Sequence, residues 1–158
     1  MAEGSDKRLS LSSPAFSPGG RIPRRYAYRG EGDNVSPPLR WSGAPAGTRS
    51  FALICDDPDA PRAEPWVHWV VYNIPAEATE LPEGSAGGAA LGVNDFEEQG
   101  WGGPMPPRGH GTHHYHFKLY ALDTLLEPRA GMTKKGLLRA MQGHILAEAE
   151  LVGTYERR

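Results

Sequence analysis

Hydrophobic and polar residues alternate along several short stretches of this chain, which is the pattern of half-buried β-strands. Residues 9–13 and 39–41 alternate in this way, and residues 50–55 are almost wholly apolar and too short for a buried helix. Residues 66–74 are rich in aromatic and β-branched side chains, and residues 113–122 continue the strand pattern. These stretches predict at least five strands.

One segment near the C-terminus has helical spacing instead. Thr133 is suited to cap a helix whose apolar positions run to Met141, and Gly143 is suited to end it. Residues 145–155 fit an extension of this helix or a strand, and we favour a strand because their apolar positions fall at even spacing. The pattern predicts a mainly β fold, a two-sheet antiparallel β-sandwich with one or two short C-terminal helices.

The 158 residues have the size of one domain. The 20 Gly and 15 Pro lie among hydrophobic residues, which indicates many turns rather than disorder. Residues 1–8 are polar and are expected to be flexible, which leaves residues 9–158 as the single domain. Residues 76–104 form a long connection with an aromatic cluster, Phe96 and Trp101, and are expected to be functional or draped over the core.

Composition argues against several classes of function. The formal net charge of -2 lacks the positive excess that attracts nucleic acids or acidic membranes. The single cysteine, Cys55, excludes an intramolecular disulfide, and its apolar surroundings favour a buried hydrophobe over a nucleophile. Because no apolar stretch approaches 18 residues and the N-terminus lacks the features of a secretory signal, we expect a cytoplasmic protein with no integral membrane segment.

Three segments hold polar residues that packing does not require. In the first, a predicted core strand ends in Asp56, Asp57 and Asp59, among prolines that fix the backbone φ. Such rigid carboxylates are typical of a binding site, and they are equally suited to Asx turns that satisfy their own backbone. Both interpretations stay open on this fragment.

The second segment is the predicted strand around His68. An unpaired imidazole in a buried strand is costly, so His68 needs a partner. A histidine in this position is more often a satisfied core residue than a functional one. Because a carboxylate is available, we expect Asp57 to bind one ring nitrogen of His68 and leave the other nitrogen facing a ligand.

The third segment, residues 103–115, is a glycine- and proline-rich loop that runs into a strand. The pleat of that strand places His113 and Tyr115 on one face. Gly109 and Gly111 permit positive φ, so their N–H groups, the imidazoles and the phenol are suited to converge on an anion. Phosphate is the leading candidate.

A metal site is the competing interpretation of this region. His114 and His116 share the other face of the strand, with His110 and the aspartates as further possible ligands. A fixed third ligand is missing from this pattern, and an exposed polar face accounts for both histidines. A serine hydrolase is weaker still, because no G-x-S-x-G motif is present.

Three motifs of this chain are, in chain order, D-P-D-A-P at 57–61, W-V-H-W at 66–69 and P-P-R-G-H-G-T-H-H-Y at 106–115. They resemble those of the phosphatidylethanolamine-binding protein family. The match is to its prokaryotic Raf-kinase-inhibitor-like branch, and it extends over nearly the whole chain. The resemblance implies a β-sandwich with a small pocket for phosphate or a phospholipid head group. The ligand-binding residues carried over by motif, with the loop glycine, are Asp57, Asp59, Trp66, His68, Pro107, Gly109, His113 and Tyr115.

The resemblance also implies a cis bond at Ala60–Pro61 and a second one at Glu64–Pro65, and it suggests a homodimer. His114 stands where the family often has arginine, which weakens anion attraction or adds a pH-dependent charge. We therefore expect non-catalytic binding of a phosphate-bearing ligand, with no cofactor, no resident metal and no nucleic-acid partner. The alternatives are a protein that regulates a kinase or protease by binding it, and a metal-dependent hydrolase that uses His114 and His116.

Overall fold

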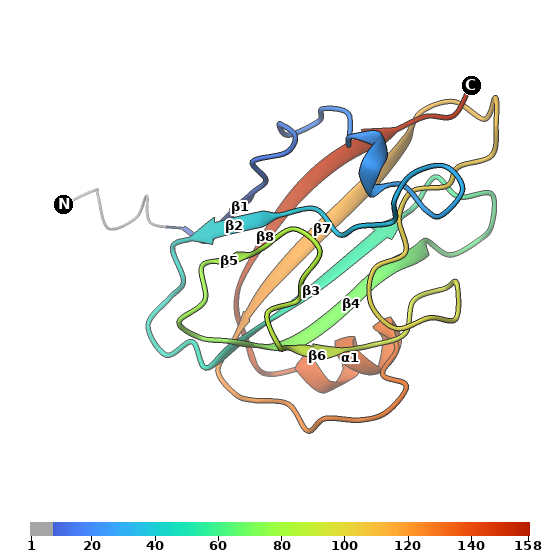
Figure 1. Cartoon of the computed structure of the whole chain (residues 1–158). Coiled ribbons are helices and arrows are strands. Elements are labelled where there is room, and N and C mark those ends of the chain that lie inside the picture. The colour runs from blue at the N-terminus through green and yellow to red at the C-terminus, as the bar shows by residue number, and fades with distance from the viewer. Residues whose placement is uncertain (1–7) are drawn as a thin grey trace.

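The computed structural model describes residues 8–158, in which two antiparallel sheets pack together (Figure 1). The small sheet has the strand order β1-β2-β5 and the large sheet has the order β6-β4-β3-β7-β8. The strand bounds are β1 (Ser10–Ser12), β2 (Leu39–Ser42), β3 (Ser50–Asp57), β4 (Trp66–Pro75), β5 (Glu80–Leu81), β6 (Ala90–Leu91), β7 (His113–Leu122) and β8 (Ile145–Tyr155). The predicted two-sheet β fold and the strand after the helix are confirmed.

The large sheet is covered on both faces. On one face Phe51 packs against Trp41 of the small sheet, with ring centroids 5.4 Å apart, and Phe117 packs against Phe16 at 5.8 Å. On the other face a second apolar cluster joins the sheet to the helix through Leu137 and other buried side chains. This double cover explains why β3, at the centre of the sheet, is buried along its whole length and is apolar from Phe51 to Cys55.

The helix α1 (Lys134–Met141) begins where the sequence predicts, because the Thr133 hydroxyl accepts a hydrogen bond from the Gly136 amide at 3.1 Å. It is the one α-helix within residues 8–158, and a 3-10 turn, η2 (Arg24–Tyr26), lies earlier in the chain. Lys134 Nζ lies 2.5 Å from Asp56 Oδ2, so this ion pair ties the helix to the end of β3. Asp56 therefore faces the helix.

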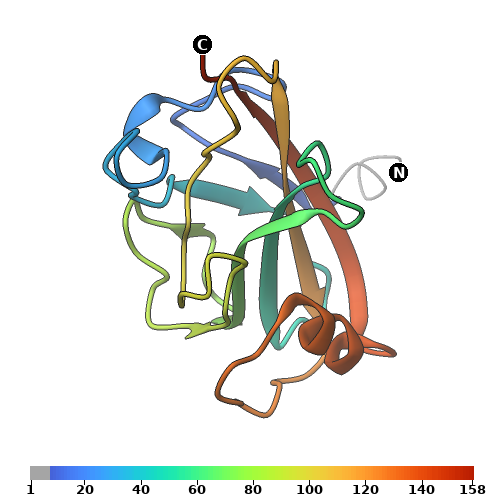
Figure 2. The ribbon, with the colours of Figure 1, turned by 90° about the vertical axis from the view of Figure 1, so that its right-hand side faces the viewer.

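Residues 76–104 are draped over the core, which is one of the two roles expected for them. They contain β5 and β6, and Trp101 is buried with its indole nitrogen donating to the Tyr26 carbonyl at 3.0 Å. In Figure 2 this connection lies to the left of the large sheet, whereas α1 lies at the lower right. The connection thus supplies one side of the space at the end of β3 and the beginning of β4.

Two further expectations meet different outcomes. No peptide bond within residues 8–158 is cis, so the cis bonds implied at Ala60–Pro61 and Glu64–Pro65 are not present, in line with the trans preference of about 0.5–1 kcal/mol for X–Pro bonds. The flexible segment was expected over residues 1–8, and all of these residues except Arg8 lie outside the described part of the chain.

Among the described helices, none is long and apolar enough to span a membrane.

Candidate functional site

A cavity of about 270 Å³ lies where β3 ends and where β4 and β7 begin. The antiparallel register brings these ends together, because Asp57 pairs with Trp66 on one side and Asp56 pairs with His116 on the other. The cavity is lined by Asp57, Ala60, Pro61, Trp66, His68, Phe96, Met105, Pro106, Pro107, His113 and Tyr115. Segments up to 58 residues apart in the chain, from Asp57 to Tyr115, therefore meet at one point.

Six of the eight predicted site residues line this cavity, and two do not. Asp59 instead accepts hydrogen bonds from the backbone amide and Nδ1 of His114, both at 2.8 Å. The Gly109 amide donates to the Arg157 carbonyl at 2.9 Å. The expectation that the Gly109 N–H points at a ligand is therefore wrong, because that N–H already bonds the loop to the C-terminal segment.

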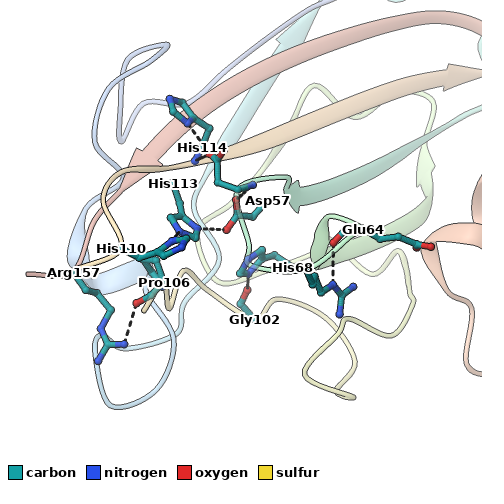
Figure 3. A network of polar contacts seen from close by, with 11 residues as sticks. Asp57, Glu64, His68, Gly102, Pro106, His110, His113, His114 and Arg157 are labelled. Atoms are coloured by element: carbon teal, nitrogen blue, oxygen red, sulfur yellow. Dashed lines mark hydrogen bonds and ion pairs between the residues drawn. The ribbon is translucent and has the colours of Figure 1, made fainter. Parts of the chain in front are cut away.

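Asp57 forms the Asx turn that the sequence left open, and it also holds a histidine. Its Oδ1 accepts from the Asp59 amide at 2.8 Å, which is the Asx turn. Its Oδ2 lies 2.6 Å from Nδ1 of His113, and both side chains are almost fully buried (Figure 3). Since a carboxylate accepts, the His113 Nδ1 carries the hydrogen and the carboxylate fixes the orientation of the ring.

The imidazole of His113 continues this chain of contacts toward the loop. Its Nε2 lies 2.6 Å from Nδ1 of His110, with the two ring centroids 4.9 Å apart (Figure 3). One hydrogen must lie between these two nitrogens for them to approach so closely. Asp57, His113 and His110 therefore form a continuous hydrogen-bonded chain from the buried strand to the exposed loop.

The expected partnership between Asp57 and His68 is wrong. His68 Nδ1 lies 2.6 Å from the Gly102 carbonyl, and the Gly102 amide donates back to the His68 carbonyl at 2.9 Å. Because a carbonyl only accepts, Nδ1 carries the hydrogen and Nε2 of the neutral ring carries a lone pair. Burial lowers the pKa of His68, so the neutral form is favoured.

Two donor side chains line the cavity. The indole nitrogen of Trp66 is buried and has no hydrogen-bond partner within residues 8–158. Tyr115 also lines the cavity, and burial raises the pKa of Tyr115 well above its ordinary value. The phenol therefore keeps its proton and remains a donor.

An aromatic wall closes the cavity, and the sequence-based site omitted it. Phe96 lies edge-on to Trp66 at 5.3 Å and to His68 at 5.7 Å, and it stacks on Tyr28 at 4.0 Å. Phe96 belongs to the aromatic cluster noted in the long connection, which was the available signal. Met105 also lines the cavity, so its walls are largely apolar around the polar groups.

The other histidines each have their own carboxylate. His114 Nδ1 lies 2.8 Å from Asp59, and His116 Nδ1 lies 2.9 Å from Glu150. Within residues 8–158 no group of three or more His, Cys, Asp or Glu side chains is arranged to hold a metal ion. The geometry gives the metal interpretation of His114 and His116 no support. Burial raises the pKa of Cys55, as expected for an inert core thiol.

Comparison with known proteins points to one family. A family model described as phosphatidylethanolamine-binding protein matches residues 12–156. A UPF0098 protein of Methanothermobacter thermautotrophicus is 48% identical over 155 residues, covering 94% of this chain and 99% of the relative. A UPF0098 protein of Chlamydia muridarum is 46% identical over 153 residues, covering 94% and 99%.

Two solved structures share the fold at substantial sequence identity. CT736 of Chlamydia trachomatis, described as a phosphatidylethanolamine-binding protein homolog, has a TM-score of 0.90 and 42% identity, and the match covers 96% of this chain and 99% of that one. YbcL of Escherichia coli, described as a new member of the mammalian PEBP family, has a TM-score of 0.88 and 36% identity, with the same coverage.

Proposed function

Because this chain belongs to the phosphatidylethanolamine-binding protein family, we propose that its cavity binds a phosphate-bearing ligand without transforming it. The observation that carries this proposal is the meeting of an Asp57-anchored imidazole, the Tyr115 phenol and an unpartnered indole N–H in one cavity.

The polarity of the groups suggests how an anion would be held. The Tyr115 hydroxyl and the Trp66 indole offer hydrogens to phosphate oxygens. His68 in its neutral form offers a lone pair at Nε2, so it would attract an anion only after taking up a proton. The apolar wall at Phe96 and Met105 would lie against the organic part of the ligand.

The direct test compares Tyr115→Phe with Tyr120→Phe. Each change removes one buried tyrosine hydroxyl, but Tyr120 belongs to the cluster on the helix side of the sheet. We expect Tyr115→Phe to weaken binding of O-phosphorylethanolamine about tenfold, since a hydrogen bond to a charged group contributes about 1.5–3 kcal/mol. Amide NMR titration of the full chain gives the dissociation constants.

Tyr120→Phe should leave the affinity within about twofold of the wild type, because it removes no group at the cavity. Equal affinities for all three proteins would argue against the proposed orientation. Absence of saturable shifts at residues lining the cavity would overturn phosphate binding there and favour a role in which the chain regulates a protein partner.

The lowered pKa of His68 gives the binding a predicted pH dependence. Above its pKa the free imidazole is neutral, whereas a bound anion favours the imidazolium, so binding takes up a proton. Affinity should therefore fall as pH rises, by up to about tenfold per pH unit. Calorimetry with sulfate, whose charge is constant near neutral pH, in buffers of different ionisation enthalpy measures the uptake.

His68→Gln serves as the control for this pH dependence, because an amide N–H can still donate to the Gly102 carbonyl. This variant should lose the proton uptake. Uptake that is unchanged in His68→Gln would assign the proton to another group, and zero uptake in the wild type would contradict the prediction.

A further inference from the structure

A second concavity, of about 380 Å³, lies on the other side of the loop that precedes β7. We call it the arginine groove, and it is lined by Arg21, Arg24, Glu31, Arg108, Glu156, Arg157 and Arg158. Three separate segments supply these side chains: residues 21–31, the loop before β7, and the chain after β8. None of these residues lines the cavity described above.

The groove has a strong local excess of positive charge. Five arginines face two glutamates, although the whole chain has a formal net charge of -2. Glu31 lies 3.4 Å from Nε of Arg157 and also accepts from the Tyr155 hydroxyl at 2.7 Å, whereas Glu156 accepts from the Thr112 hydroxyl at 3.2 Å. Because two carboxylates face five guanidinium groups, an excess of three positive side chains remains in the groove.

Much of the hydrogen-bonding capacity of these arginines is also unused within residues 8–158. Arg21 lies over the Tyr155 ring at 4.6 Å and donates no hydrogen bond there. Arg24 uses its Nε to donate to the Glu31 carbonyl at 2.8 Å, which leaves its terminal nitrogens free. The Nε of Arg157 is buried without a hydrogen-bond partner and lies 3.4 Å from a Glu31 oxygen.

We propose that the arginine groove is a binding site for a polyphosphate group, separate from the cavity. Planar guanidinium groups match phosphate oxygens two at a time, and such charge-assisted bonds are the stronger ones. One phosphate neutralises less than the excess of three positive side chains, so a group with two or more phosphates fits the charge better. This inference does not rest on the proposed function of the cavity.

The groove and the cavity nevertheless share a wall. Arg157 Nη1 donates to the Pro106 carbonyl at 3.1 Å, and Pro106 lines the cavity (Figure 3). The Arg157 carbonyl also accepts from the Gly109 amide at 2.9 Å. A polyphosphate in the groove would contact the residue that holds this loop, so shifts of the Arg108 and Gly109 amide signals should accompany binding.

The test is a titration of the full chain with inorganic tripolyphosphate, followed through the arginine Nε–H signals in NMR spectra. The double variant Arg24→Gln/Arg108→Gln removes two exposed members of the groove. Arg40→Gln is the matched control, because Arg40 is exposed on β2 and pairs only loosely with Glu80 at 3.8 Å. We expect the double variant to lose at least about tenfold in affinity and Arg40→Gln to change it less than about twofold.

Further measurements distinguish a nucleotide from inorganic polyphosphate as the ligand, and they distinguish the arginine groove from the cavity as the binding site. Equal affinity for adenosine triphosphate and tripolyphosphate would support recognition of the phosphates alone, and tighter binding of the nucleotide would support a contribution from its base. Loss of tripolyphosphate binding in Tyr115→Phe but not in the groove variant would place the ligand in the cavity and overturn the proposal. Equal losses in the groove variant and Arg40→Gln, or binding of a phosphoserine peptide without tripolyphosphate binding, would also overturn it.

Discussion

Replacing His113 with alanine is expected to lower the free energy of unfolding by about 3 kcal/mol, the lower end of the cost of breaking a buried pair. The change leaves the Asp57 carboxylate, whose side chain is 4% exposed, without its imidazole partner at 2.6 Å. The remaining hydrogen bond from the Asp59 amide satisfies only one of its oxygens. Urea denaturation followed by circular dichroism measures the loss.

The double variant Asp57→Asn/His113→Ala is the control for this interpretation. It removes the buried charge as well as its partner, so it should be more stable than His113→Ala by at least about 1 kcal/mol. A loss below about 1 kcal/mol in His113→Ala, or a double variant no more stable than the single one, would contradict the view that the buried Asp57 carboxylate depends on its imidazole partner. Under conditions where His113→Ala is folded, it should also bind O-phosphorylethanolamine at least about tenfold more weakly, because loss of the ring leaves the Asp57 carboxylate of the cavity without its partner and its negative charge repels the anion.

Phe117→Ala is expected to cost about 4 kcal/mol of unfolding free energy, because it leaves a cavity between the two layers of the sandwich. Phe117 is fully buried, its ring stacks on Trp101 at 5.9 Å, and Phe16 lies 5.8 Å away on the same side. Trp101 in turn lies beside His68, so this packing supports one edge of the site. Thermal and urea unfolding both report the loss.

Two variants bracket this expectation. Phe117→Leu keeps most of the buried volume and should cost less than about 1.5–2 kcal/mol. Leu125→Ala removes an apolar side chain that is 58% exposed and should change stability by no more than about 0.5 kcal/mol. If Phe117→Ala cost no more than Leu125→Ala, the ring would not be part of a close-packed core.

Local pattern predicted the elements of this fold because strand and helix periods are local properties. The sequence predicts a strand over residues 113–122 with His113 and Tyr115 on one face, and β7 has these bounds with both residues buried. The helix begins after Thr133 because its cap involves residues three apart. The expected strand over residues 145–155 is confirmed for the same reason, since even spacing places Leu151 and Tyr155 on one face, which packs into the apolar core.

The membership of the site was predicted in part. Asp57, His68, His113 and Tyr115 line the cavity as their motifs suggested, because the ends of three antiparallel strands bring those motifs together. Phe96 was not assigned to the site, since a loop of residues 76–104 has no periodicity that says which side chain turns inward.

The partners within the site were decided by the tertiary structure. His68 binds the carbonyl of Gly102, 34 residues away, and leaves Asp57 to His113, 56 residues away. Gly109 satisfies its amide at Arg157, although its sequence context suggested an open anion-binding loop. A sequence determines that a buried imidazole, carboxylate or amide needs a hydrogen-bond partner, because desolvation without one is costly. Which partner it finds depends on how distant segments pack, and only the folded chain fixes that choice.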